Sequence, residues 1–591
     1  MTNKTTIIIS LLSAVCALPA AAQVSKEITV EREVVATLRE VSPMTFTPSV
    51  ALPAVEKPTL TYSERTITAR IPALFGLLEP AAVADSIAAS PWRGYAALGY
   101  FPAFNLGASA GYRIIDTRRT ALDAWMQYDG NSYNVDRGIL TDHDLPEDAS
   151  RSVKSQNVAL GFRLGQAIGR HGHLGLGLSY ALDHFNNPFA PTIVGAPHNQ
   201  SLHRVDADAI FSSRTNDLGY SLGLDYNLFS FANGFDQRYD EINPVRENRV
   251  GLKGALFADI DEKSSYRLDI DASMLSMSQA AAPPMIWTTS GSALDYLTKR
   301  DGKTSGLVTI TPAYRYGAEH FRVKIGARLD LSFNDGKFFH IAPDVKAVWT
   351  PSGFFALYGR AGGGEHQNTM GSLYAVDRFI APSFFYSNSH VPIEAEAGLR
   401  VGPFRGASLN LSAHYAVAND WLMPFAKSTG YVLFGATDVR GWQFQAVASY
   451  SYRNMATLSV KGILSPVAEK KVTRCYYTNL DHARYVLDTE LTLHPMEQLD
   501  ILVGYELRAS RSMRWHEEGE MFDYDVWIPG AYDYKIRMKN LANLRVGASW
   551  RFTPAFTLFG RVENILNRTT SSFSLIPSQG VKGLIGVAYK F

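Results

Sequence analysis

The stretch 541-LANLRVGASWRFTPAFTLFGRVENILN-567, together with 583-GLIGVAYKF-591, decides the fold of this chain. It contains three segments in which side-chain character alternates with a period of two. In the last segment, one face carries Ile585, Val587, Tyr589 and Phe591. Successive side chains of a β-strand point to opposite faces, so each segment is apolar on one side and polar or small on the other. Such strands suit a wall between lipid and a wet lumen.

The same alternation recurs far upstream. One face of residues 321–331 carries only apolar side chains, and the other face carries Arg322, Lys324 and Arg328. A charged side chain that faces lipid at the bilayer midplane costs about 2–4 kcal/mol, so we expect the charged faces to point inward. These inward charges either line a solute path or form cross-strand ion pairs that stiffen the wall. The expected inward set is Arg267, Asp269, Asp271, Arg322, Lys324, Arg328, Glu506, Arg508, Arg545, Arg561 and Glu563.

The N-terminal part of the chain divides into two segments. Residues 1–22 have the features of a secretory signal peptide: a basic start at Lys4, a short apolar run, and small residues before Gln23. Residues 23–92 contain seven prolines, which exclude long helices and central strands. We interpret them as an extended periplasmic segment ahead of a barrel over residues 93–591.

The composition supports an exported barrel that works without cofactors. The chain has 57 basic and 56 acidic residues, which gives a net charge of +1, so nucleic acid is not an expected partner. Once the signal peptide is removed, Cys475 is the only cysteine, which excludes an internal disulfide. No enzyme motif is present, and we expect no cofactor. Only helices and closed barrels cross membranes, because unpaired backbone groups are too costly in hydrocarbon.

The alternation from Arg93 onward predicts an all-β, antiparallel transmembrane barrel of about 22 strands, in the outer membrane and with both chain ends in the periplasm. The predicted strands lie near residues 93–101, 104–114, 119–128, 154–166, 172–184, 202–213, 218–229, 248–259, 264–274, 304–316, 320–332, 339–349, 353–361, 391–402, 406–416, 439–452, 455–465, 483–494, 499–511, 541–552, 556–567 and 583–591.

The connections between these strands alternate in length, which is typical of barrels with short periplasmic turns and long external loops. Two connections, near 101–104 and 334–337, should be external yet are short. The predicted long loops are 129–153, 185–201, 230–247, 275–303, 362–390, 417–438, 466–482, 512–540 and 568–582.

Two of these loops carry candidate binding features. The loop from Arg514 to Tyr534 is the most plausible contact with a ligand or partner protein, because exposed aromatic side chains can stack on a ligand or anchor a protein. Its aromatic residues include Trp515, Phe522, Tyr524 and Trp527. The alternative is that they form the aromatic girdle of the barrel or pack over its mouth. Acidic residues between Asp142 and Asp148 either bind calcium or form a solvated loop.

Two further features concern glycine and the N-terminal segment. The run Gly362–Gly364 lacks a following Lys-Ser/Thr pair, so we interpret it as a loop glycine run and not as a phosphate cradle. The stretch Glu27, Ile28, Thr29, Val30 and Glu31 alternates, and it could add as a strand to the sheet edge of a partner. The other interpretation is a flexible leader to the first strand.

The stretch from Arg551 to Asn567, followed by Gly583 to Phe591, resembles the closing strands of TonB-dependent outer-membrane receptors. The resemblance implies a 22-stranded barrel, and it implies that the terminal aromatic residues, Tyr589 and Phe591, belong to the signal read by the outer-membrane assembly machinery. The segment from Glu27 to Pro80 resembles the leader of such receptors in the Bacteroidetes lineage. The chain departs from that family in the length ahead of the first strand, which leaves no room for a full plug domain.

Two functions follow from this resemblance. The first is a receptor-like barrel that takes part in solute uptake, with residues 27–31 as the contact with TonB. The second is a structural subunit of a larger outer-membrane complex, in which the barrel contacts other envelope proteins and lipid. The family resemblance favours the first function, and the missing plug favours the second.

Overall fold

The computed structural model describes residues 92–591 except 103, 136–151, 189–198, 216, 234–244, 278–303, 381–385, 427–431, 467–478, 524–525, 572 and 575. The side chains of residues 425, 426, 433 and 514–536 are also outside the description. The expected signal peptide, most of the segment 23–92 and the candidate partner strand Glu27–Glu31 therefore lie outside the described residues. So does the acidic loop between Asp142 and Asp148.

The described residues form strands along almost their whole length. The strands are β1 (Gly94–Phe101), β2 (Asn105–Asp116), β3 (Thr120–Asn134), β4 (Ser152–Ile168), β5 (Gly172–Asn186), β6 (Asn199–Arg214), β7 (Leu218–Phe231), β8 (Val245–Asp259), β9 (Ser264–Met277), β10 (Thr304–Gly317), β11 (Phe321–Phe333), β12 (Phe339–Ser352), β13 (Phe355–His366), β14 (Ser389–Phe404), β15 (Ala407–Ala426), β16 (Val432–Tyr452), β17 (Ala456–Leu464), β18 (Tyr485–Met496), β19 (Leu499–Ala509), β20 (Ser512–Asp523), β21 (Val526–Arg537), β22 (Leu541–Arg551), β23 (Phe556–Glu563) and β24 (Lys582–Lys590). In the described part of the chain, no helix is long and apolar enough to cross a membrane.

The strands close into one antiparallel barrel. Each strand pairs with its neighbour in the chain up to β19, which then pairs with β22, and β24 pairs with β1. In the closing pair Tyr95 lies opposite Lys590, and the backbone N–H of Phe591 donates to Gly94 O at 3.0 Å. Because β20 and β21 pair mainly with each other, 22 strands form the wall. The predicted strand number and the closure of the C-terminus on the first strand are confirmed.

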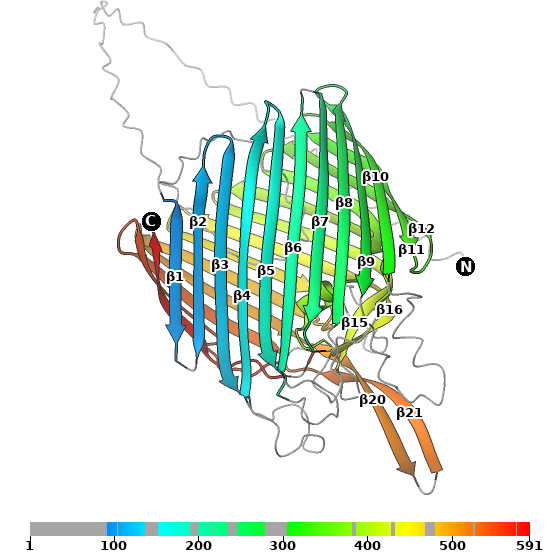
Figure 1. Cartoon of the computed structure of the whole chain (residues 1–591), viewed down its shortest axis with the longest axis vertical. Coiled ribbons are helices and arrows are strands. Elements are labelled where there is room, and N and C mark those ends of the chain that lie inside the picture. Colours follow the sequence, from blue (N-terminus) through cyan, green and yellow to red (C-terminus); the bar gives the residue numbers. More distant parts are fainter. Residues whose placement is uncertain are drawn as a thin grey trace, which may run out of the picture. The chain divides into compact units, whose positions relative to one another are not determined.

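The two ends of the barrel differ, as Figure 1 shows. One end, the short-turn end, carries tight links such as Ile168–Gly172 and Phe404–Ala407. The opposite, long-loop end carries the extended connections, and the β20–β21 hairpin projects there (Figure 1). The two short links that break the rule, Phe101–Asn105 and Phe333–Phe339, lie at the long-loop end, as the alternation predicts.

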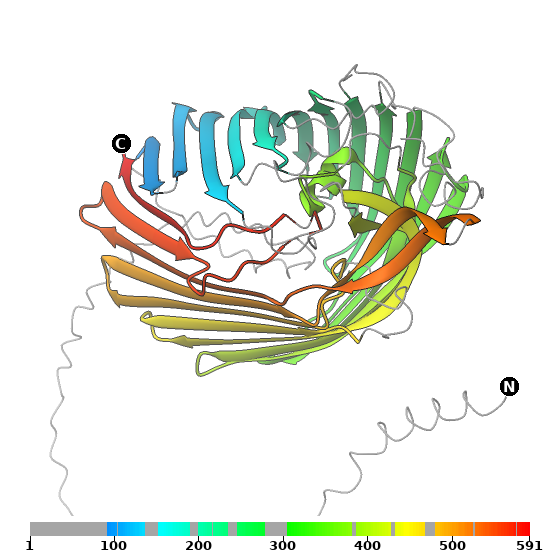
Figure 2. The ribbon, with the colours of Figure 1, turned by 90° about the horizontal axis from the view of Figure 1, so that it is seen from below.

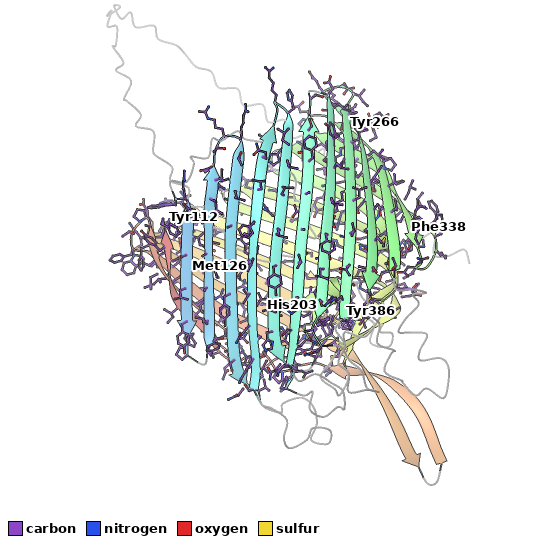
Figure 3. All side chains as sticks on the ribbon, in the orientation of Figure 1. Tyr112, Met126, His203, Tyr266, Phe338 and Tyr386 are labelled. Carbon is purple, nitrogen blue, oxygen red and sulfur yellow. The ribbon has the colours of Figure 1, made fainter. Side chains whose placement is uncertain are left out.

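The wall has apolar residues outside and charged residues inside, the reverse of a water-soluble core. Ile325 and Tyr266 belong to the predicted outward faces and are 55% and 57% exposed, whereas Asp330 is 0% exposed. Figure 3 shows side chains over the full height of the wall, with Met126 and Tyr266 among the exposed apolar ones. An apolar outer surface of this extent needs lipid as its solvent.

In three of the predicted loops, secondary structure covers about half or more of the residues. Residues 417–438 lie mostly in β15 and β16, which continue because Asp420 adopts a φ of 52° where the register between the two strands shifts. Beyond this bulge, Leu422 and Met423 are buried, so packing extends the strands past the predicted strand end at 416. The loop 512–540 contains the β20–β21 hairpin. The loop 362–390 contains the end of β13 and the helix α2 (Met370–Val376).

A charged residue should be tolerated on only one face of the wall. Ile325→Arg places a charge against lipid in the middle of β11, and we expect it to lower the free energy of unfolding by about 2–4 kcal/mol. Thr311→Arg on the neighbouring β10 is the matched control, because Thr311 faces Asp269 in the lumen. The measurement is urea unfolding of the full chain in lipid vesicles. Equal losses for the two variants would contradict the facing assignment.

Candidate functional site

The connection between β13 and β14 folds into the barrel. We call its described residues, 367–380 and 386–388, the internal loop. Its helix α2 begins after Thr369, whose side chain accepts from Ser372 N at 3.0 Å while Ser372 Oγ accepts from Thr369 N at 3.0 Å. Asp377 is extended, with a φ of −151°, and ends the helix. Seen from the long-loop end in Figure 2, α2 lies inside the ring of strands.

Polar contacts tie the start of the internal loop to β8 and β9. Both carboxylate oxygens of the buried Glu247 accept from Met370 N, at 3.0 and 2.9 Å. The side-chain oxygen of Gln367 accepts from Arg249 Nε at 3.2 Å and from Ser273 Oγ at 3.0 Å. A charged acceptor buried with its donor forms one of the stronger kinds of hydrogen bond, so Glu247 is a main anchor.

A second anchor lies on β5. Asp183 accepts a hydrogen bond from the Tyr374 hydroxyl and pairs with Arg378 Nη2 at 3.5 Å. Burial, and then the neighbouring Asp183 carboxylate, raise the pKa of Tyr374 above its usual value, so the phenol stays protonated and donates. Asp377 Oδ2 accepts from Ser574 N at 3.1 Å, which joins the internal loop to the β23–β24 connection.

An apolar cluster fills the space between the internal loop and the surrounding strand ends. Its members come from the long-loop ends of β6–β9, β15 and β16, from α2, and from the connections beside them. They are Leu202, Phe229, Phe231, Val245, Met277, Met370, Leu373, Ile380, Tyr386, Leu422, Val432, Phe434, Met513, Met538 and Phe573. Close packing of this kind excludes water, so the internal loop is held as a packed layer across part of the lumen.

A polar chamber of about 750 Å³ lies between the internal loop and the wall from β6 to β11. Gln367 and Thr369 of the internal loop contribute to its lining. The lining also contains six carboxylates and four basic side chains, namely Asp206, Asp208, Asp225, Asp269, Asp271 and Glu365, and Arg204, Arg249, Lys253 and Arg328.

The charges of the chamber do not balance. Asp225 pairs with Arg249 at 2.7 Å and with Lys253 at 3.0 Å. Within the described part of the chain, neither Asp208 nor Asp271 takes part in an ion pair. The chamber therefore has an excess of negative charge, which in a walled space of low dielectric attracts cations.

Some of the inward charges form ion pairs, and some line the polar chamber; their part in a solute path stays a prediction. Arg267 pairs with Asp269 at 2.6 Å along one strand, β9. Arg545 of β22 pairs with Glu490 of β18 at 3.1 Å, so this pair joins different strands. Asp269, Asp271 and Arg328 also line the polar chamber. The predicted set thus contributes both to the stiffness of the wall and to the lining of the lumen.

A buried group of three residues could hold a metal ion. His340, Glu365 and His390 come from the long-loop ends of β12, β13 and β14, and their ligand atoms all lie within 4.8 Å of one another. The sequence gives no sign of this group, because the three residues are far apart in the chain and form no motif. Only the strand register brings them together.

The glycine run Gly362–Gly364 is part of β13 and not of a loop, which corrects the sequence interpretation. The register of β13 shifts here, and Gly364 has a φ of 122°. A Cβ atom at Gly364 would lie 2.4 Å from Arg328 Nε. Glycine is therefore needed where the Arg328 side chain crosses the backbone of β13.

The candidate aromatic loop forms a hairpin, not an irregular loop. The backbones of Trp515 and Phe522 lie in β20, and that of Trp527 lies in β21, where Phe522 and Trp527 are register partners. Tyr524 lies outside the described residues, as do the side chains of the other three. Their role as a ligand or partner contact stays a prediction.

The C-terminal aromatic residues lie on the closing seam. The Phe591 ring stacks on Tyr112 of β2, with ring centroids 6.0 Å apart, and on Tyr589, with centroids 6.1 Å apart. All three rings are exposed, Phe591 by 47%. They form an accessible aromatic patch at the short-turn end.

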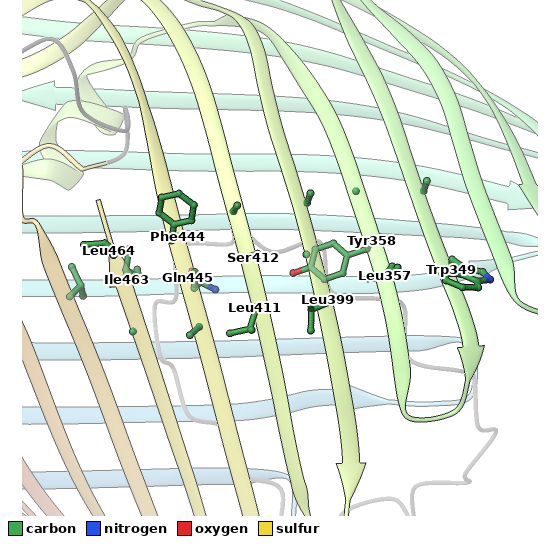
Figure 4. Close-up of a pocket in the computed structure, with 18 of the residues that line it drawn as sticks. Trp349, Leu357, Tyr358, Leu399, Leu411, Ser412, Phe444, Gln445, Ile463 and Leu464 are labelled. Atoms are coloured by element: carbon green, nitrogen blue, oxygen red, sulfur yellow. The ribbon is translucent and has the colours of Figure 1, made fainter. Parts of the chain in front are cut away.

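An apolar hollow of about 1040 Å³ crosses the wall from β11 to β18. Trp349 and Phe444 are among its lining residues in Figure 4, where the labelled side chains form a band across neighbouring strands. Trp349 lies opposite Phe321 in the ladder and therefore shares the outward face with it. Because its exposed rings face lipid, this hollow is separate from the polar chamber in the lumen.

Comparisons with known proteins identify relatives by structure only. No protein-family model matches the sequence, and no curated protein matches it. The siderophore receptor PirA from Acinetobacter baumannii is similar in structure, with a TM-score of 0.62, 10% identity, and coverage of 84% of this chain and 80% of that chain.

Two further solved structures are similar to the same extent. The ferric enterobactin receptor PfeA from Pseudomonas aeruginosa has a TM-score of 0.62 and 9% identity, and covers 84% of this chain and 81% of its own. The FrpB iron transporter from Neisseria meningitidis has a TM-score of 0.61 and 13% identity, with 85% and 82% covered. At this identity the likeness shows the fold, which is that of outer-membrane receptor barrels.

The two anchors should hold the internal loop across the lumen. Glu247→Ala removes the acceptor of Met370 N, and a hydrogen bond to a charged group contributes about 1.5–3 kcal/mol. We expect the double variant Glu247→Ala/Asp183→Ala to raise the single-channel conductance of the full chain in planar bilayers. Glu490→Ala, which removes a lumenal carboxylate paired with Arg545 on another part of the wall, should leave the conductance unchanged. An unchanged conductance in a correctly folded double variant would contradict the anchoring role.

Proposed function

We propose that this chain is an outer-membrane, receptor-like barrel that takes part in the uptake of a polar solute. The observation that carries the proposal is the polar chamber of about 750 Å³ inside a closed barrel, beneath an anchored internal loop. A chamber lined by charged and polar side chains suits a polar solute, and an apolar outer wall suits a bilayer. The likeness in fold to a siderophore receptor and an iron transporter supports uptake over catalysis.

The orientation follows the usual arrangement of such barrels. We assign the short-turn end to the periplasm and the long-loop end to the outside. The chain then enters β1 from the periplasmic side, because β1 begins at the short-turn end, and we propose that segment 23–92 lies in the periplasm. In this arrangement the internal loop is the outer gate of the chamber. A solute that enters from outside must pass the internal loop before it reaches the carboxylates of the chamber.

The alternating stretch Glu27–Glu31 is the proposed contact with TonB or another envelope protein. An extended segment that adds to a sheet edge gains affinity from backbone hydrogen bonds. It would transmit force or position from the periplasm to the barrel.

A structural role within a larger envelope complex is the second candidate. The β20–β21 hairpin favours it, because this hairpin projects from the long-loop end (Figure 1) and its sequence carries Trp515, Phe522 and Trp527. Exposed aromatic residues are frequent anchors in protein interfaces. The hairpin is also compatible with solute capture. An experiment must therefore distinguish solute uptake from the structural role.

Uptake can be tested without knowing the solute. We expect a strain that lacks this chain to deplete at least one polar solute of a defined medium more slowly than the parent strain. A chain that lacks residues 23–40 should assemble normally, judged by its mobility on unboiled gels, yet fail to restore uptake. Mass spectrometry of the spent medium gives the measurement. If no solute changes while the chain co-purifies in fixed stoichiometry with other envelope proteins, the structural role replaces the transport role.

Phe591 should matter for assembly more than for stability. We expect Phe591→Ala to lower the amount of barrel in the outer membrane, because the assembly machinery would read the terminal aromatic patch. Phe552→Ala, which removes a ring that is 68% exposed beside the last short turn, is the control. Spontaneous folding of both variants into lipid vesicles should be similar. If Phe591→Ala slows folding in vesicles as much as in cells, its role is the seam itself.

A further inference from the structure

Three buried ligand atoms meet at the long-loop ends of β12, β13 and β14. Glu365 Oε2 lies 2.8 Å from His340 Nδ1 and 3.3 Å from His390 Nδ1. The two imidazole rings are stacked, with centroids 4.0 Å apart and planes at 20°. The Glu365 side chain is 4% exposed, and those of His340 and His390 are 12% and 18% exposed.

These atoms are close but do not satisfy one another. Among the described residues, three buried atoms make no hydrogen bond. They are His340 Nδ1, His390 Nδ1 and Glu365 Oε2. A buried polar atom without a hydrogen bond loses its hydration with no compensation. Two imidazole nitrogens and one carboxylate oxygen within 4.8 Å of one another form a typical set of ligands for a transition metal, and the stacked rings would tilt so that both nitrogens face the ion.

The backbone of Glu365 is held in place by its neighbours. Glu365 N donates to Asp330 Oδ2 at 2.8 Å, and Glu365 O accepts from Arg328 Nη2 at 2.6 Å. Asp330 also accepts from Arg328 Nε at 3.0 Å and from Thr309 Oγ1 at 2.5 Å. These hydrogen bonds fix the backbone from which the Glu365 side chain extends, before a metal binds.

The histidine at the other end of the internal loop is equally fixed. Ser389, next to His390, is fully buried, and its hydroxyl donates to Asp420 O at 2.8 Å and accepts from Asn368 Nδ2 at 2.9 Å. Asn388 N donates to Asp335 Oδ2 at 2.9 Å. Hydrogen bonds therefore hold the backbone at Glu365 and next to His390. A metal could bind there with little rearrangement of the backbone.

We propose that His340, Glu365 and His390 bind a divalent transition-metal ion. Zinc bonds of about 2.0–2.2 Å in a tetrahedral arrangement place ligand atoms about 3.3–3.5 Å apart. The distance from His390 Nδ1 to Glu365 Oε2 already meets this value, and the distance from His340 Nδ1 must widen by about half an ångström. The ion reaches the site through the polar chamber, which Glu365 lines and whose excess of carboxylates attracts cations.

The ion would clamp the base of the internal loop. Glu365 lies two residues before the loop begins at 367, and His390 lies two residues after it ends at 388. The β13–β14 ladder already pairs Glu365 with His390 at the base of the loop, and a metal would add a side-chain link there and extend it to His340 of β12. The occupied site would therefore hold the internal loop across the lumen more firmly than its hydrogen bonds do alone.

Metal binding is tested on the full chain purified in detergent with a tag that contains no histidine. Equilibrium dialysis against Zn²⁺, followed by metal analysis, should give one more tightly bound zinc per wild-type chain than for His340→Asn, Glu365→Gln or His390→Asn. We expect each variant to weaken binding by at least about tenfold. Co²⁺ should give a visible absorption band with the wild type only. Mobility on unboiled gels confirms that each variant is folded.

His414→Asn is the matched control, because His414 is a buried lumenal histidine 3.6 Å from Glu396 and, among the described residues, belongs to no cluster of three ligands. It should bind zinc like the wild type. Equal zinc binding by the wild type and the three ligand variants would overturn the proposal and leave an ordinary buried pair of histidine and glutamate. Zinc that binds but does not lower the bilayer conductance of the wild type relative to Glu365→Gln would overturn the clamp. These readouts require no transported solute, so they stand or fall apart from the proposed uptake.

Discussion

Every backbone polar group of a lipid-facing wall must find its partner inside the wall, and the pairing of β1 with β24 supplies the last of these partners. An open edge at either strand would leave a row of N–H and C=O groups in hydrocarbon, each at a cost of several kcal/mol. Closure also fixes which face of each strand is inside. The alternation of apolar and charged residues along β9 and β11 is stable only in that closed arrangement, because exchanging the faces would place Asp269, Asp271 and Arg328 in lipid.

A closed wall creates an interior that water and charge can occupy, and the internal loop gives that interior its shape. The loop leaves the wall at β13 and is held at β5, β8 and β9 through Asp183, Glu247 and Gln367. Its apolar side packs with the ends of β6–β9, β15 and β16, and its polar start lines the chamber. One segment therefore covers part of the lumen at the long-loop end and lines part of the chamber.

The histidine and glutamate group connects this loop to the wall at the loop's own ends. Arg328 and Asp330, which line or adjoin the chamber, also hold the backbone of Glu365. Gly364 permits this, since a larger residue would collide with Arg328. Arg328, Asp330 and Glu365 thus belong to one hydrogen-bonded network, through which an ion at the proposed site would act on both the chamber and the base of the loop.

The sequence alone determined the strand number, the closure and the facing of the wall, because period-two alternation and short turns are local and survive in every hairpin. Tertiary structure alone decided the rest. The strand predicted over 406–416 was expected to end there, but a bulge at Asp420 and the burial of Met423 carry β15 onward to Ala426. The loop after His366 showed no sign of folding inward, since its anchors, Glu247 and Asp183, lie far away in the chain. The approach of His340 and His390 to Glu365 is likewise a consequence of strand register, which no spacing along a single strand reveals.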